Sequence, residues 1–169
     1  VIPKRKVSPS AQLQAFLGVD IGSTTTKTVL MDANQNIIHK QYVQTQGKPI
    51  EVAQRLLEGI REEFGDGIEF LGTATTGSGR HVVGDFIKAD LIIDEITAHA
   101  RAAVYWYPDV DTVFEIGGQD SKYIWIEQGN PMDFDMNKVC AAGTGSFLHE
   151  LANKLKINIV REFQDIALS

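Results

Sequence analysis

The chain has 169 residues, 43% of them hydrophobic, which suits one compact domain with its own core. Its formal net charge of −6 argues against a general nucleic-acid surface, which needs a basic face, although backbone N–H groups and a metal ion can still hold phosphates. One cysteine excludes an internal disulfide, and no apolar run reaches the roughly 18 residues of a membrane span, so we expect a cytoplasmic protein without membrane contact.

Residues 1–15 contain two prolines and a basic cluster without apolar periodicity, and they predict a linker or tail before a domain that covers residues 16–169. The domain opens with a predicted meander of three strands at residues 16–21, 27–32 and 37–44. An amphipathic helix over residues 49–64 follows, because its apolar residues recur at helical spacing and Pro49 suits a first helical turn.

Strands and helices alternate in the rest of the chain. Strands are predicted at 68–74, 91–94, 112–116 (buried), 122–127 and 134–139, and helices at 81–88, 95–105, 145–156 and 161–168. This order predicts an α/β fold in which helices flank a mixed sheet. No short internal repeat is apparent. Because the last helical pattern runs to Ser169, we interpret the chain as a fragment of a larger protein.

A glycine turn between the first two strands has the composition of an anion site. Gly22 lets the backbone approach a phosphate, and a tight turn can point successive N–H groups inward. Asp20 can hold Mg²⁺ through water, and Lys27 can offset phosphate charge. Further donors are the hydroxyl groups of Ser23, Thr24 and Thr25. The alternative for this segment alone is an ordinary hairpin, since Gly and Ser belong in turns.

A second turn of the same kind follows the strand at 112–116. Glu115 lies near the end of that strand, Gly117 and Gly118 form the turn, and Gln119 and Asp120 add polar groups. One hairpin of this type means little, but two turns that each follow an acidic residue can face the two sides of a triphosphate.

The two turns together resemble the superfamily of actin, sugar kinases and heat-shock chaperone ATPases, which implies a ribonuclease H-like, actin-like ATPase domain. The resemblance implies that Asp20 and Glu115 arrange Mg²⁺ and water. It assigns the phosphates to a set of turn residues: Ser23, Thr24, Thr25, Gly117, Gly118 and Gln119. Many relatives have Asp where this chain has Glu115, and Asp120 is the alternative for orienting water.

The lone cysteine, Cys140, precedes a run of small residues and the predicted helix from Gly145. A thiolate or a negatively charged metal cluster is favoured near a helix N-terminus. The alternative is a small buried hydrophobic residue, which is what an isolated cysteine usually is.

The segments IGSTTTK, EIGGQDSK and NKVCAAGTGSFL resemble, in order and spacing, the activators of 2-hydroxyacyl-CoA dehydratases, the BadF/BadG/BcrA/BcrD ATPase family. The resemblance implies ATP or ADP with Mg²⁺, a homodimer, and a [4Fe-4S] cluster held by two cysteines from each subunit. Cys140 matches the first cysteine, and the second is not in this chain. Gly143, Thr144 and Gly145 are assigned to the nucleotide as well.

The resulting hypothesis is an ATPase module of a larger, multi-domain activase-like protein that drives electron transfer to a dehydratase. We expect the full-length protein to hydrolyse ATP and this fragment to bind nucleotide weakly, with negligible hydrolysis. The alternatives are an amino-sugar kinase of the same superfamily and a non-catalytic nucleotide-sensing or scaffold domain.

Overall fold

The computed structural model describes residues 13–140, 142–159 and 161–169, without the side chain of Asp66. Most of the predicted linker therefore lies outside the described residues. The chain divides into two compact units, residues 1–98 and 99–169, which we describe separately.

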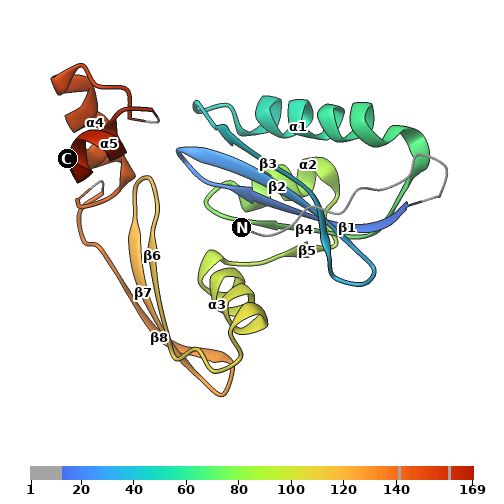
Figure 1. Cartoon of the computed structure of the whole chain (residues 1–169). Coiled ribbons are helices and arrows are strands. Elements are labelled where there is room, and N and C mark those ends of the chain that lie inside the picture. Colours follow the sequence, from blue (N-terminus) through green and yellow to red (C-terminus); the bar gives the residue numbers. More distant parts are fainter. Residues whose placement is uncertain (1–12, 141, 160) are drawn as a thin grey trace. The chain divides into compact units, whose positions relative to one another are not determined.

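Unit 1 is a five-stranded mixed sheet with the strand order β3-β2-β1-β4-β5 (Figure 1). Strands β1, β2 and β3 form the predicted antiparallel meander, and β4 and β5 extend the sheet in parallel with β1. The strands are β1 (Leu13–Ile21), β2 (Thr25–Asp32), β3 (Ile37–Gln44), β4 (Ile68–Thr76) and β5 (Leu91–Ile92). The helices are α1 (Pro49–Phe64), a short 3-10 turn (Gly65–Gly67) and α2 (Arg80–Ile87).

The core of unit 1 lies between the sheet and the two helices. Alternate residues of β1, from Ala15 to Ile21, are buried, as expected for a strand with one face on the core. Ala53 and Ile60 of α1 and Val83 of α2 join the same cluster. Both helices therefore cover one face of the sheet, and the other face carries Gly18 and Asp20.

Helix α3 (Glu95–Trp106) leads from unit 1 into unit 2, whose sheet is an antiparallel meander with the order β6-β7-β8. The remaining elements are β6 (Thr112–Ile116), β7 (Ser121–Glu127), β8 (Asn130–Met136), α4 (Gly145–Leu155) and α5 (Phe163–Leu168).

Several predicted elements differ from the structure in their bounds or burial, and three of these differences bear on the site. The strand at 112–116 is not buried: β6 is an edge strand, and its alternate side chains Phe114 and Ile116 are 75% and 69% exposed. Strand β8 spans 130–136 rather than 134–139, because Gln128 and Gly129 have positive φ and reverse the chain in two residues. Strand β1 begins at Leu13, before the predicted start at Phe16.

Among the described residues, no helix is both long and apolar enough to cross a membrane.

Candidate functional site

The first glycine turn, residues 22–25 (turn 1), joins β1 to β2. Asp20 and Lys27 are direct partners in the ladder, and Lys27 Nζ donates to Asp20 Oδ2 at 2.8 Å. The N–H of Gly22 donates to the carbonyl of Thr25 at 2.9 Å. A Cβ atom on Gly22 would lie 2.9 Å from that carbonyl oxygen, so this close turn needs glycine.

The loop between β4 and α2 closes onto turn 1. The N–H of Gly79 donates to the carbonyl of Ile21 at 2.9 Å. Gly77 has φ +86°, and a Cβ atom there would lie 2.5 Å from Asp20 Oδ1 and 2.5 Å from Ile21 O. The absence of a side chain at Gly77 therefore makes room for the Asp20 carboxylate.

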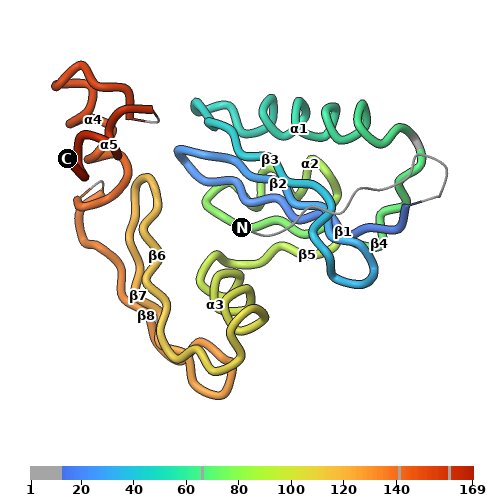
Figure 2. The backbone as a smooth tube through the Cα atoms, viewed as in Figure 1, coloured from blue at the N-terminus to red at the C-terminus, as the bar shows by residue number. Residues whose placement is uncertain are grey.

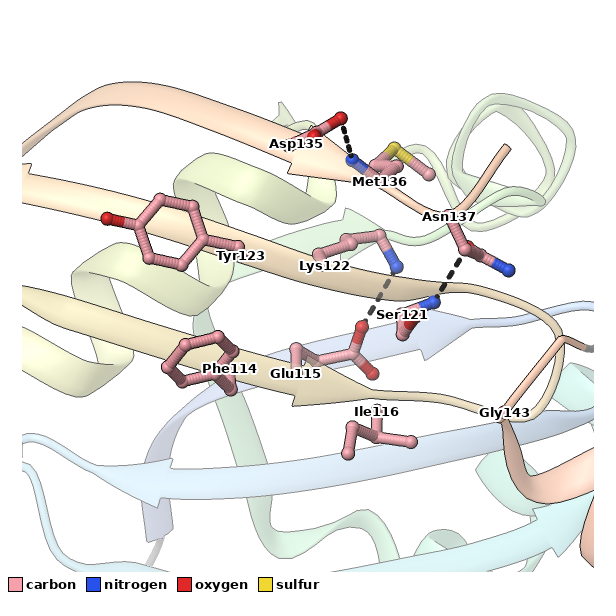
Figure 3. Close-up of a pocket in the computed structure, with 10 residues that line it drawn as sticks. All are labelled: Phe114, Glu115, Ile116, Ser121, Lys122, Tyr123, Asp135, Met136, Asn137 and Gly143. Carbon is pink, nitrogen blue, oxygen red and sulfur yellow. Dashed lines mark hydrogen bonds and ion pairs between the residues drawn. The ribbon is translucent and has the colours of Figure 1, made fainter. Parts of the chain in front are cut away.

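The second glycine turn, residues 117–120 (turn 2), joins β6 to β7. Glu115 and Lys122 are ladder partners, and Lys122 Nζ donates to Glu115 Oε2 at 2.9 Å (Figure 3). The N–H of Gly117 donates to the carbonyl of Asp120 at 2.8 Å. The Lys122 side chain is only 5% exposed, whereas that of Lys27 is 34% exposed.

The two turns are a structural repeat, so the prediction that the chain has no short repeat is wrong. In each, an acidic residue, Ile and Gly are followed by a lysine seven positions after the acid, which pairs with it across the ladder. The glycine N–H in each turn donates to the carbonyl three residues on. The spacing D-I-G-x-x-x-T-K and E-I-G-x-x-x-S-K is visible in the sequence once Glu is allowed to match Asp and Ser to match Thr.

The start of α4 lies beside turn 2 (Figure 2). The N–H groups of Gly145 and Ser146 donate to the carbonyls of Gly117 and Gly118 at 2.9 and 2.8 Å. Thr144 is fully buried, and its hydroxyl donates to Gly118 O at 2.9 Å. These donors of Thr144 and Gly145, which were assigned to the nucleotide, are thus engaged in holding turn 2.

Further hydrogen bonds are made by Gln119 and Asp120 of turn 2 and by Ser121, which follows it. Gln119 Nε2 donates to Ser146 Oγ at 3.1 Å, and the carbonyl of Asp120 accepts from Gly117. Asn137 accepts the N–H of Ser121 at 2.9 Å. Asn137 was not predicted as a site residue, although it is the first residue of the segment NKVCAAGTGSFL.

Each unit has a hollow beside its turn. The hollow in unit 1, about 260 Å³, is lined by Asp20, Lys27 and Thr76 together with small and apolar residues. The Thr76 hydroxyl is buried and makes no hydrogen bond to another described residue. The hollow in unit 2, about 390 Å³, is lined by Glu115, Lys122 and their neighbours (Figure 3).

Cys140 is exposed, just before the loop into α4. Within the described parts of the chain, no three His, Cys, Asp or Glu side chains gather as metal ligands.

The predicted site residues fall into two groups. Asp20, Gly22, Lys27 and the hydroxyl residues of turn 1 lie together in unit 1. Those of turn 2, with Cys140 and the start of α4, lie in unit 2. That the turns face two sides of one triphosphate stays a prediction.

A family model, described as the BadF/BadG/BcrA/BcrD ATPase family, matches residues 17–167. The chain is 35% identical over 143 residues to the (R)-2-hydroxyglutaryl-CoA dehydratase activating ATPase of Acidaminococcus fermentans, a match over 85% of this chain and 54% of that protein. It is 37% identical to the activator of lactoyl-CoA dehydratase of Anaerotignum propionicum, with the same shares covered.

Among solved structures, the chain resembles the activator of the 2-hydroxyisocaproyl-CoA dehydratase from Clostridium difficile with bound ADPNP. The TM-score is 0.74 at 32% identity, over 85% of this chain and 53% of that one. A protein of lower identity, EutJ from Carboxydothermus hydrogenoformans, shares the fold, with a TM-score of 0.60 at 19% identity. The predicted actin-like ATPase fold is confirmed. The chain spans about half the length of the curated relatives it matches.

Proposed function

Because the chain belongs to the BadF/BadG/BcrA/BcrD ATPase family, we propose that it is the phosphate-binding part of an ATP-driven activator of a 2-hydroxyacyl-CoA dehydratase. In this proposal the full-length protein is a homodimer that hydrolyses ATP and passes an electron to its dehydratase partner. The 169 residues alone bind nucleotide weakly, because they span about half of the curated relatives.

The observation that carries the proposal is the repeated turn. Each copy places an acid–lysine pair beside a glycine whose N–H already has an acceptor within the turn. Tight turns of this kind present further N–H groups as an anion nest, which suits a phosphate. The similar activator with bound ADPNP supports nucleotide as the ligand.

A magnesium ion would be held beside Asp20. Mg²⁺ prefers oxygen ligands and keeps several of its waters. The Asp20 carboxylate lines one hollow together with the Thr76 hydroxyl, which has no hydrogen-bond partner among the described residues, so these residues fit an ion with its water shell. The ion would neutralise charge on the phosphate oxygens. Asp20 would orient the water shell and Lys27 would balance the carboxylate until nucleotide binds.

A [4Fe-4S] cluster needs four ligands, and this chain supplies one thiol, that of the exposed Cys140. Two copies of the chain would supply two. The residues present therefore do not complete a cluster site, and we assign Cys140 only as one ligand of a site that requires further cysteines.

The relatives described above are activators of dehydratases, which favours this function over the amino-sugar kinase.

The test is ATP turnover by the full-length protein, purified without oxygen, with Asp20→Asn beside wild type. We expect Mg²⁺-dependent hydrolysis that Asp20→Asn abolishes. Asp85→Asn is the matched control, because Asp85 is an exposed carboxylate on α2 of the same unit. Turnover that survives Asp20→Asn would show that the site is misplaced. Iron content that is equal in wild type and Cys140→Ser would contradict the ligand assignment.

A further inference from the structure

A buried threonine contacts each glycine turn from the segment that follows the third strand of its meander. We propose that Thr45, and Thr144 in the second unit, are positioning residues that orient the peptide groups of turns 1 and 2 toward an anion. This inference rests on the proposed nucleotide site and adds Thr45 to it.

Thr45 follows β3 directly, and its side chain is 3% exposed. Its hydroxyl donates to the carbonyl of Gly22 at 2.7 Å, and its N–H donates to the carbonyl of Thr24 at 2.9 Å. The Thr26 hydroxyl lies 2.9 Å from Thr45 Oγ1. Since the only Thr45 hydroxyl proton is used on Gly22, Thr26 is the donor in this contact. One residue thus holds two carbonyls of turn 1.

Because peptide groups are planar, fixing these two carbonyls also fixes the direction of the N–H groups that follow them. In a trans peptide the N–H points opposite to the C=O of the same group. Because the carbonyls of Gly22 and Thr24 point to Thr45, the N–H groups of Ser23 and Thr25 point away from it. Loss of the Thr45 hydroxyl would free the Gly22 carbonyl and let the Gly22–Ser23 peptide rotate.

Turn 2 is held from the start of α4 by a different arrangement of donors. The Thr144 hydroxyl and the Ser146 N–H both donate to Gly118 O, and the Gly145 N–H donates to Gly117 O. The N–H groups of Gly118 and Gln119 therefore point away from α4. In each unit a buried threonine hydroxyl donates to a turn carbonyl, Gly22 O in turn 1 and, one position later in the repeat, Gly118 O in turn 2. This recurrence ties the threonines to the turns rather than to general packing.

The experiment is calorimetric titration of the full-length protein with ADPNP and Mg²⁺. Thr45→Val keeps the shape of the side chain and removes the hydroxyl, and Thr45→Ser keeps the hydroxyl. We expect Thr45→Val to weaken ADPNP binding about tenfold, the order expected for loss of the hydrogen bond to the Gly22 carbonyl of turn 1. Thr45→Ser should stay within about twofold of wild type.

Thr28→Val is the matched control. Thr28 lies on β2, is 1% exposed, and donates its hydroxyl to Gln41 Oε1 at 3.0 Å, away from the turn. Thr28→Val therefore removes one side-chain hydrogen bond of a buried threonine, whereas Thr45→Val removes two, the one to the Gly22 carbonyl and the one from the Thr26 hydroxyl. We expect Thr28→Val to lower the melting temperature without changing ADPNP affinity. Equal affinity losses in the two variants would assign Thr45 a purely structural role.

The outcomes separate the two proposals. Wild-type protein that does not bind ADPNP overturns the proposed function and this inference with it. Binding that Asp20→Asn weakens but Thr45→Val leaves unchanged overturns the inference alone. If Thr45→Val does not fold, the pair Thr144→Val and Thr144→Ser makes the same comparison at turn 2. There, unchanged affinity in Thr144→Val overturns the inference.

Discussion

The contact between Gly77 and Asp20 gives a quantitative prediction for Gly77→Ala. The new methyl group would lie 2.5 Å from Asp20 Oδ1, 2.5 Å from Ile21 O and 2.7 Å from the Ile21 carbonyl carbon. The Ile21 carbonyl also accepts the Gly79 N–H. The substitution must therefore displace the carboxylate and the strand end that support turn 1.

The expected loss in unfolding free energy has two contributions, one from the backbone conformation and one from the steric clash. A left-handed φ costs an L-residue about 1–2 kcal/mol, and Gly77 has φ +86°. Forcing extra atoms into a packed site costs about 1–3 kcal/mol more. We expect Gly77→Ala to lower the free energy of unfolding by about 2–5 kcal/mol and to weaken nucleotide binding, because Asp20 moves.

The assay is urea unfolding of Gly77→Ala beside Gly47→Ala. Gly47 has a similar φ of +69°, but a Cβ atom there meets nothing within 4 Å. The control therefore carries the backbone cost without the steric one, and should lose only about 1–2 kcal/mol. Equal losses in the two variants would refute the steric reasoning.

Two further predictions concern charged groups. Lys122→Met should lower the free energy of unfolding in urea by about 3–5 kcal/mol, because Glu115 would lose its partner in a buried pair. Lys27→Met, at the pair that is about one-third exposed, should lower it by about 1 kcal/mol or less. Equal losses in the two variants would contradict this. Hydrogen bonds from the N–H and then the hydroxyl of Thr97 lower the pKa of Asp94, so its stabilisation is full above the ordinary Asp pKa and is lost as pH falls through the lowered value. The difference in unfolding free energy between wild type and Asp94→Asn should therefore vanish in acid, and a pH-independent difference would contradict it.

Much of the fold was predictable because periodicity and local signals agreed. The bounds predicted for α1 and β3 are those observed, since each begins and ends at a change in pattern. The exposure of Phe114 and Ile116 was not predictable, because an apolar run does not say whether its strand lies at an edge. Register pairs Lys27 with Asp20 and Lys122 with Glu115, and neither pair was predicted from the sequence.

The residues that support the glycine turns were harder to predict from the sequence than the turns themselves. Thr45 lies 23 positions after Gly22, and only the return of β3 beside β2 brings its hydroxyl to the turn. Gly77 and Asp20 meet because β4 is parallel to β1. Such long-range contacts follow from topology, which the sequence pattern does not specify for single residues.

We propose that each of the two glycine turns binds nucleotide phosphate. Amide hydrogen exchange of the full-length protein, with and without ADPNP and Mg²⁺, tests it most directly. We expect the peptides covering residues 20–27 and those covering residues 115–122 both to become slower to exchange when ADPNP binds. Slowing at one turn alone, or at neither, would contradict it.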